Sequence, residues 1–419
     1  MTERFVLTER PRYLTNGRDR AAVAAAVVAS GRVFLSGQNA LSADGSVVGL
    51  GDPAAQADAA LDHIEAALSA AGGSLKDITK LTTCIVDRDH RKAVYEAIGR
   101  RLPAVFPVST GLVTAGLPLP RMMVQIDAEA VIPKPGTDPV RRLRTFELKD
   151  WFGQNIAWQG AMVAASEQEI FVRGQTGASL DGKSMDGLGR RPEDAAAQAE
   201  RALSNLALLL REAGSLMDDV CKITVYISDR AYRSAVYPVI GKHFRGIHPV
   251  STGIIMPAFA RSEILFEIDA QVVRNRAGVP HTRLRRYHSN VARYGTEQQP
   301  LDCDFCMAVC AGRHVILRGQ TGVDLTEVMR GRGDAVAQAS QAMDNVATLL
   351  AEAGAQLSDV VKATVFVTDR AFLAGVSETV LDRLKGVAPA FTVMIVKGLA
   401  SPELLMEVDV TAIIPEQRS

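Results

Sequence analysis

The sequence has few aromatic residues and no excess of charge of either sign. Aromatic residues make up 5% of the chain, and 47 Lys and Arg side chains are balanced by 47 Asp and Glu. A net charge of zero argues against a dominant role in binding nucleic acids or anionic membranes, which basic proteins attract. We therefore expect no nucleic-acid or membrane partner, although one or two local cations suffice to bind a small anion.

Long apolar runs and a leader-like start are also absent. No apolar run approaches the roughly 20 residues that a membrane-spanning helix needs. The N-terminal segment Met1–Val6 lacks the basic-then-apolar order of a signal peptide. Five cysteines in 419 residues are too few for a disulfide framework. Together these absences predict a cytoplasmic protein.

Cys303, Cys306 and Cys310 are close enough in sequence to suggest a metal site. On one strand, however, Cys306 and Cys310 would point to one face and Cys303 to the other. No histidine at a suitable spacing completes a ligand set, and the motifs of phosphate-binding and zinc-protease sites are missing. We expect these cysteines to be small buried residues, and we expect no metal or cofactor.

What the sequence does contain is a long internal repeat. The segment Lys222–Arg230 has counterparts at Lys80–Arg88 and Lys362–Arg370, which lie 142 residues before it and 140 residues after it. A proline and a glutamine recur at the same spacing: Pro107, Pro249 and Pro389, and Gln56, Gln198 and Gln338. A repeat of this length is a whole domain rather than a solenoid unit. The recurring lysines are expected to serve the structure.

Shifts in composition place the joins between the copies. Pro133–Pro139 and Arg274–Pro280 are rich in Pro and Gly and read as linkers. We therefore predict three domains, at residues 1–137, 138–278 and 279–419.

The middle copy predicts the fold. β-rich runs and helical periodicities alternate in the order β-β-β-α-β-α-β-β, at 145–149, 160–165, 169–173, 192–213, 220–228, 232–244, 250–256 and 263–273. This order favours an α+β domain in which a mixed sheet carries both helices on one face. The other face is also apolar, so we expect the three sheets to face inward and to cover one another.

Three segments recur in each copy: a helix-and-strand block such as 198–222, a C-terminal strand pair such as 249–273, and a Gly-Gln bend, which is Ser36-Gly37-Gln38, Arg173-Gly174-Gln175 and Arg318-Gly319-Gln320. In these segments the chain resembles the Rid family, also called YjgF-like, of imine and enamine deaminases. The resemblance implies a chorismate-mutase-like fold and ligand clefts between subunits of a trimer. Here it implies a single-chain pseudo-trimer, monomeric or in a higher homo-oligomer, that binds small molecules between its repeats.

The resemblance also implies two functional groups, of which one is missing. The family's Pro-Ala-Arg-Thr/Ser motif supplies an Arg that holds the substrate carboxylate in a bidentate pair. The matching segments 107–110, 249–252 and 389–392 contain no Arg. The family's catalytic Glu is matched by Glu267 and Glu407, whereas repeat 1 has Gln125. Repeat 1 is therefore predicted to have a degenerate site.

Arg173 and Arg318 are candidates to replace the missing Arg. They occur in the two repeats that keep the Glu, and repeat 1 has Ser36 instead. We predict that these arginines bind substrate together with further residues: Gly174, Gln175, Gly319, Gln320, Ser251, Thr252 and Trp158. Alternatively, the arginines point away from the cleft, and the carboxylates form ion pairs that serve only the structure.

Three functions agree with these residues. The first is a Rid-like hydrolase that acts on a C–N or C=N bond of a small anionic metabolite, with Glu267 and Glu407 activating water and N–H groups near Gly174 and Gly319 holding negative charge. The second is a non-enzymatic binding or regulatory protein. The third is a ring-opening amidohydrolase that pairs Ser109 or Ser251 with a lysine, although the Ser-rich glycine motifs of such enzymes are absent.

Overall fold

The computed structural model describes residues 2–6, 23–133, 136, 139–275, 278–289 and 301–418. Met1 and parts of both predicted linkers, among them Lys134 and Ala277, lie outside these residues. Within the described ranges, none of the helices combines the length and the apolar character that crossing a bilayer requires.

Each repeat contains the same principal elements in the same order. Repeat 1 consists of β1 (Glu3–Val6), β2 (Ala24–Ala29), β3 (Arg32–Leu35), β4 (Gln38–Asn39), α1 (Pro53–Ala70), β5 (Ile78–Ile85), α2 (Arg91–Arg101), β6 (Val108–Val113) and β7 (Val124–Val131). Repeat 2 consists of β8 (Arg141–Glu147), β9 (Gln159–Ala165), β10 (Glu169–Val172), β11 (Gln175–Thr176), α3 (Pro192–Glu212), β12 (Val220–Ile227), α4 (Arg233–His243), β13 (Val250–Ile255), β14 (Ala258–Phe259) and β15 (Phe266–Val273). Repeat 3 consists of β16 (Thr282–Leu284), β17 (Tyr287–His288), β18 (Asp304–Phe305), β19 (Ala308–Ala311), β20 (His314–Leu317), α5 (Ala335–Glu352), β21 (Val360–Val367), α6 (Arg370–Arg383), β22 (Ala390–Ile395) and β23 (Met406–Ile413).

The strands of repeat 2 form a mixed sheet in the order β13-β12-β15-β10-β9-β8. β12 and β13 run parallel because α4 carries the chain back between them, and the other neighbours on this path are antiparallel. Repeats 1 and 3 have the same strand order, and their sheets join where β2 pairs with β22. The predicted α+β fold is confirmed, with the short strands β11 and β14 as additions.

Helix α3 shows how the local sequence sets an element. Pro192 occupies the first turn, where a missing N–H costs nothing. Asp194 accepts a hydrogen bond from the backbone N–H of Arg191 at 3.0 Å. The apolar residues of the helix fall on one buried face. Gly214, with a φ of 78°, follows the last turn and lets the chain leave the helix.

Alternation along the central strand gives each sheet two different faces. In β12, Ile223 and Val225 belong to the apolar core beneath the helices. Lys222, Thr224 and Tyr226, one residue out of step, face the centre of the molecule. Successive strand side chains point to opposite faces, so the helices cover one face and the other repeats cover the second.

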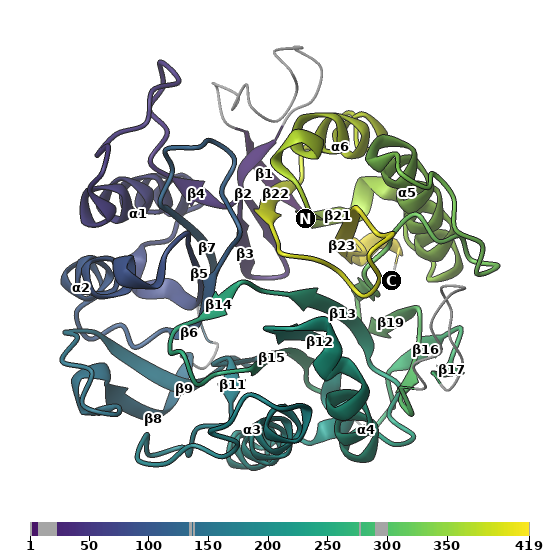
Figure 1. The fold of residues 1–419 in the computed structure, drawn as a ribbon. Helices are drawn as coiled ribbons and strands as arrows, with labels where there is room; N and C mark the ends of the chain where they lie inside the picture. Colours follow the sequence, from purple (N-terminus) through teal and green to yellow (C-terminus); the bar gives the residue numbers. More distant parts are fainter. Residues whose placement is uncertain are drawn as a thin grey trace.

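The three repeats lie around a common centre with their helices on the outside (Figure 1). β14 of repeat 2 pairs with β6 of repeat 1, and β2 of repeat 1 pairs with β22 of repeat 3. Repeats 2 and 3 meet at a bridge between Ile255 and Gly398. Each repeat therefore contacts both of the others.

The last strand of repeat 2 begins at Phe266, three residues later than predicted. The side chain of Gln198 explains the difference, because its oxygen accepts a hydrogen bond from the N–H of Leu265 at 2.8 Å and its nitrogen donates to the carbonyl of Glu263 at 2.7 Å. Because these backbone groups are already hydrogen-bonded to Gln198, they do not pair with a neighbouring strand. Gln56 and Gln338 bond the corresponding segments in the same way, which gives the recurring glutamine a structural role.

The first strand of repeat 2 lies earlier than predicted. The expected strand at 145–149 is β8, Arg141–Glu147, and Leu148–Asp150 form a 3-10 turn. The turn places Leu148 and Trp151 in the core, and burying these two large side chains favours a turn over continued pairing.

Candidate functional site

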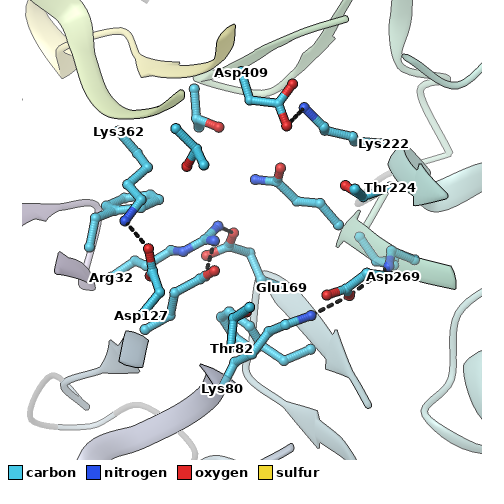
Figure 2. A pocket seen from close by; sticks show the side chains of 18 of the residues that line it. Arg32, Lys80, Thr82, Asp127, Glu169, Lys222, Thr224, Asp269, Lys362 and Asp409 are labelled. Carbon is cyan, nitrogen blue, oxygen red and sulfur yellow. Dashed lines mark hydrogen bonds and ion pairs between the residues drawn. The ribbon is translucent and has the colours of Figure 1, made fainter. Parts of the chain in front are cut away.

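Residues of all three repeats line one cavity, and Figure 2 shows it from close by. At each interface a lysine of one repeat forms an ion pair with an aspartate of another: Lys80 with Asp269, Lys222 with Asp409 and Lys362 with Asp127. Arg32 in the same cavity pairs with Glu129 and Glu169. Each charged side chain among the described lining residues thus has an ion-pair partner. The cavity holds the repeats together rather than presenting free charge to a ligand.

A threonine hydroxyl adds a second bond at each of these interfaces. Thr110 donates to Asp269 at 2.9 Å, and Thr252 donates to Asp409 at 2.5 Å. Thr252, predicted to bind substrate, is therefore used by the neighbouring repeat and does not line a cleft. The recurring lysines have the structural role that the sequence suggested.

Cleft A, between repeats 1 and 2, contains many of the predicted residues. Repeat 2 contributes Arg173, Gly174, Glu267 and Trp158. Repeat 1 contributes residues of α2, β6 and their surroundings: Arg91, Tyr95, Ser109 and Gly111. The space of the cleft, counted together with its open mouth, is about 560 Å³.

The arginines of cleft A lie against aromatic rings. The guanidinium of Arg173 lies 4.9 Å from the ring centre of Phe146 and 4.8 Å from that of Trp151, and Arg91 lies 5.1 Å from that of Tyr95. A guanidinium held by ring faces keeps its N–H donors for other partners. Within the described residues, the Arg173 guanidinium forms no hydrogen bond. Burial lowers the pKa of Arg173 to about 10, which leaves it charged at neutral pH.

Glu267 and Glu407 are buried carboxyl groups that line the clefts, each with 5% of its surface exposed. Among the residues that the structure describes, neither carboxyl has a hydrogen-bond or ion-pair partner, so the ion-paired alternative does not apply there. Burial raises the pKa of each carboxyl to about 8, and Arg173 and Arg318 offset part of the rise. At pH 7 both groups are mainly protonated and can donate a proton.

Cleft B, between repeats 2 and 3, repeats this arrangement. Arg233 lies 4.4 Å from the ring centre of Tyr237 and donates to its hydroxyl at 3.1 Å. Arg318 lies 5.5 Å from the ring centre of Tyr287. Ser251, Gly319 and Glu407 complete the predicted part of the lining. The cleft encloses about 450 Å³ including its mouth.

The third equivalent position, between repeats 3 and 1, lacks both halves of this arrangement. Gln125 replaces the glutamate, and its side-chain nitrogen donates to the carbonyl of Val393 at 2.9 Å. Phe391 replaces the serine and is 3% exposed in the core of repeat 3. The hydroxyl of Ser36 accepts a hydrogen bond from the N–H of Phe391 at 2.8 Å. The polar groups of repeat 1 are thus used to join it to repeat 3.

Several predicted contributions to binding are not available in the clefts. The side-chain nitrogens of Gln175 and Gln320 donate to the carbonyls of Arg173 and Arg318, both at 2.7 Å, so these glutamines shape the bend behind each cleft. The N–H of Gly174, expected to hold negative charge, donates to the carbonyl of Ser109 at 3.3 Å.

The alternative Ser–Lys pair does not form at Ser251. In the register of β12 and β13, Ser251 lies beside Ile223, whose side chain is on the helix-covered face. Lys222 faces the central cavity and binds Asp409. Ser251 and Lys222 therefore lie on opposite faces of the sheet.

Sequence reasoning missed the half of each cleft that the preceding repeat supplies. Arg91 and Tyr95 of repeat 1 recur as Arg233 and Tyr237 in repeat 2, but repeat 3 has Leu373 and Ser377 instead. Repeat 1, in turn, has Ser36 and Gln125 where repeats 2 and 3 have an Arg and a Glu. Both sets of replacements fall at the same interface, the one between repeats 3 and 1, which therefore lacks the residues of clefts A and B.

The cysteines behave as buried small residues. Cys303 and Cys306 are buried and Cys310 is half-buried. The thiol of Cys303 donates to the carbonyl of Tyr237 at 2.7 Å, behind cleft B. Among the residues described here, no group of His, Cys, Asp and Glu is arranged to hold a metal ion.

Fold and clefts together define a three-repeat α+β protein with clefts between its repeats. Comparison with known proteins extends this to a family, because the model of the family described as Endoribonuclease L-PSP matches residues 20–132, 157–274 and 297–414. The chain belongs to this family, and the predicted resemblance to the Rid family is confirmed.

Curated relatives match single stretches of the chain. Protein DfrA of Myxococcus xanthus is 36% identical over 91 residues, which are 22% of this chain and 70% of that protein. RutC family protein slr0709 of Synechocystis is 32% identical over 104 residues, which are 25% of this chain and 77% of that protein. Each such relative corresponds to about one repeat.

A solved structure resembles the chain over most of its length. A crystal structure of a chorismatase matches with a TM-score of 0.53, and the match covers 80% of this chain and 93% of the chorismatase chain. The two sequences are 14% identical, so the likeness concerns the fold alone.

Proposed function

We propose that the protein is a hydrolase that acts on a C–N or C=N bond of a small anionic molecule, with clefts A and B as its two active sites. One observation carries the proposal: in each cleft a buried carboxyl without a partner among the described residues faces ring-stacked arginines. An unpaired buried carboxyl costs stability, and such groups concentrate where a reaction uses them.

The chemistry follows from the protonation state of the carboxyl. Glu267, protonated at pH 7, donates its proton to the substrate nitrogen and makes the C=N carbon electrophilic. The resulting carboxylate takes a proton from water as the water oxygen bonds to that carbon. The same proton then passes to the nitrogen. The C–N bond breaks while the hydroxyl proton returns to the Glu267 carboxylate, so that a carbonyl compound and an amine leave and the protonated acid is restored.

Arginines supply the binding that this reaction needs. Arg173 and Arg91 in cleft A, and Arg318 and Arg233 in cleft B, take over the anchoring role of the family's missing Arg. Their donors reach an acidic group of the substrate from two repeats at once. Such clamping fixes the C=N bond beside the carboxyl, which lowers the entropic part of the barrier.

Imine hydrolysis tests the proposal. An amino-acid oxidase generates 2-imino acids, and semicarbazide traps what remains after each variant has acted. We expect wild type to shorten the imine lifetime, Glu267→Gln and Glu407→Gln each to lose part of this effect, and the double variant to lose it. Glu193→Gln, on the exposed first turn of α3, is the control.

Two results would count against this function. Full activity in the double Gln variant would remove the glutamates from the mechanism. An unchanged imine lifetime with wild type, together with tight binding of the imine's carbonyl product, would favour the non-enzymatic binding protein.

A further inference from the structure

Among the residues that the structure describes, clefts A and B differ in one cation. Cleft A has a third arginine in its lining, Arg261. The equivalent position of repeat 3 is Ser401, and two arginines, Arg233 and Arg318, occur among the described residues that line cleft B. The two clefts therefore present different sets of donors.

Arg261 is held in the manner of the other cleft arginines. Its guanidinium lies 4.3 Å from the ring centre of Phe152. One nitrogen, Nη2, donates to the carboxylate of Glu263 at 2.8 Å. Glu263 also accepts a hydrogen bond from the hydroxyl of Ser262 at 3.1 Å, so its charge is shared. Arg261 thus keeps donors that Glu263 does not use.

Cleft A also gathers buried N–H groups that lack a partner. Three of them, Arg91 Nε, Arg261 Nε and Trp158 Nε1, have no hydrogen-bond acceptor among the described residues. Folded proteins pair most of their buried donors, so a group of unpaired donors around one cleft indicates a missing ligand rich in acceptor oxygens. A single carboxylate offers about four acceptor sites, which is fewer than the N–H donors that three guanidinium groups present.

We propose that cleft A binds a small dianion, whose first acidic group contacts Arg91 and Arg173 and whose second acidic group contacts Arg261. This inference rests on the proposed function, in which the arginines anchor the substrate. Cleft B, with Ser401 at the equivalent position, binds molecules that carry one acidic group as well as those that carry two. The protein accordingly has two sites of different specificity in one chain.

A matched pair of probes tests the inference, because succinate and butyrate have the same number of carbons and differ in one carboxylate. Isothermal titration calorimetry measures their binding to wild type and to Arg261→Ser, which gives cleft A the residue of repeat 3. We expect wild type to bind succinate about tenfold more tightly than butyrate, as for a charge-assisted contact. Arg261→Ser is expected to lose this preference.

The reverse exchange guards against a folding defect in Arg261→Ser. Ser401→Arg is expected to raise the number of tight succinate sites per chain from one to two. Equal binding of the two probes by wild type, an unchanged preference in Arg261→Ser, or an unchanged number of sites in Ser401→Arg would each overturn the inference. Those results would not contradict the proposed hydrolysis. Failure of both probes to bind, in contrast, would contradict anion binding in both clefts and therefore the proposed function as well.

Discussion

The carboxyl group of Glu267 occupies the space that a side chain at position 174 would take. A Cβ atom on Gly174 would lie 2.1 Å from Glu267 Oε1, and one on Gly319 would lie 1.8 Å from Glu407 Oε1. Real atoms do not approach so closely. The glycine that follows Arg173 therefore fixes where the proton donor stands, which ties the Gly-Gln bend to the chemistry of the cleft.

Gly174→Ala is expected to displace the carboxyl and to stop turnover in cleft A. The measurement is imine hydrolysis in a Glu407→Gln background, in which the remaining activity comes from cleft A alone. Activity is expected to fall by two orders of magnitude or more, since loss of a positioned acid costs about 10²–10⁴-fold.

Gly37→Ala in repeat 1 provides the matched control. A Cβ atom there would lie 3.0 Å from Thr392 and 3.1 Å from Gln125, so a small shift accommodates it. Its activity is expected to equal that of the parent. Equal activities of the two Ala variants would contradict the positioning role of Gly174.

The raised pKa of Glu267 and Glu407 predicts that stability falls between about pH 4.5 and pH 8. In this range the carboxyl groups ionise in the unfolded protein but keep their protons in the folded protein. Ionisation therefore stabilises the unfolded state relative to the folded state. At pH 7 each carboxyl is expected to cost on the order of 3 kcal/mol. Urea denaturation at pH 5 and pH 7.5 measures the difference.

The double variant Glu267→Gln, Glu407→Gln provides the comparison. Gln does not titrate, so the variant is expected to show a flatter dependence on pH and to be more stable than wild type at pH 7.5. Parallel pH dependences of the two proteins would contradict the assigned pKa values.

Phe391→Ala is expected to destabilise the protein without affecting catalysis. The ring is buried where clefts A and B are open, and its removal leaves a cavity that costs about 3–5 kcal/mol. Denaturation is expected to show this loss, and activity per folded molecule is expected to stay at the wild-type value. A fall in that activity would indicate that the third interface takes part in turnover.

Lys222→Met is expected to weaken the interface between repeats 2 and 3. The Lys222–Asp409 pair is nearly buried, and removing one partner leaves an uncompensated charge at a cost of about 3–5 kcal/mol. Arg144→Met is the matched control, because its pair with Glu212 is well exposed and is expected to contribute less than about 1 kcal/mol. Denaturation midpoints compare the two variants, and similar midpoints would count against the interface role.

Much of the fold could be predicted from the sequence because local residue patterns determine most of its helices and strands. The helical periodicity before Gly214 and the β-branched run of β12 gave elements that the structure contains. Boundaries failed where a distant side chain intervened, as Gln198 does at the start of β15. A pattern of neighbours along the chain does not report such a contact.

The sequence by itself determined that one domain occurs three times, that Glu267 and Glu407 carry the carboxyls, and that repeat 1 lost its own. Only the tertiary structure decided which repeats share a cleft. Arg91 and Glu267 meet although they are far apart in the chain, because β14 pairs with β6 and brings the α2 side of repeat 1 against repeat 2. Burial, which raises the carboxyl pKa, arises only from that packing.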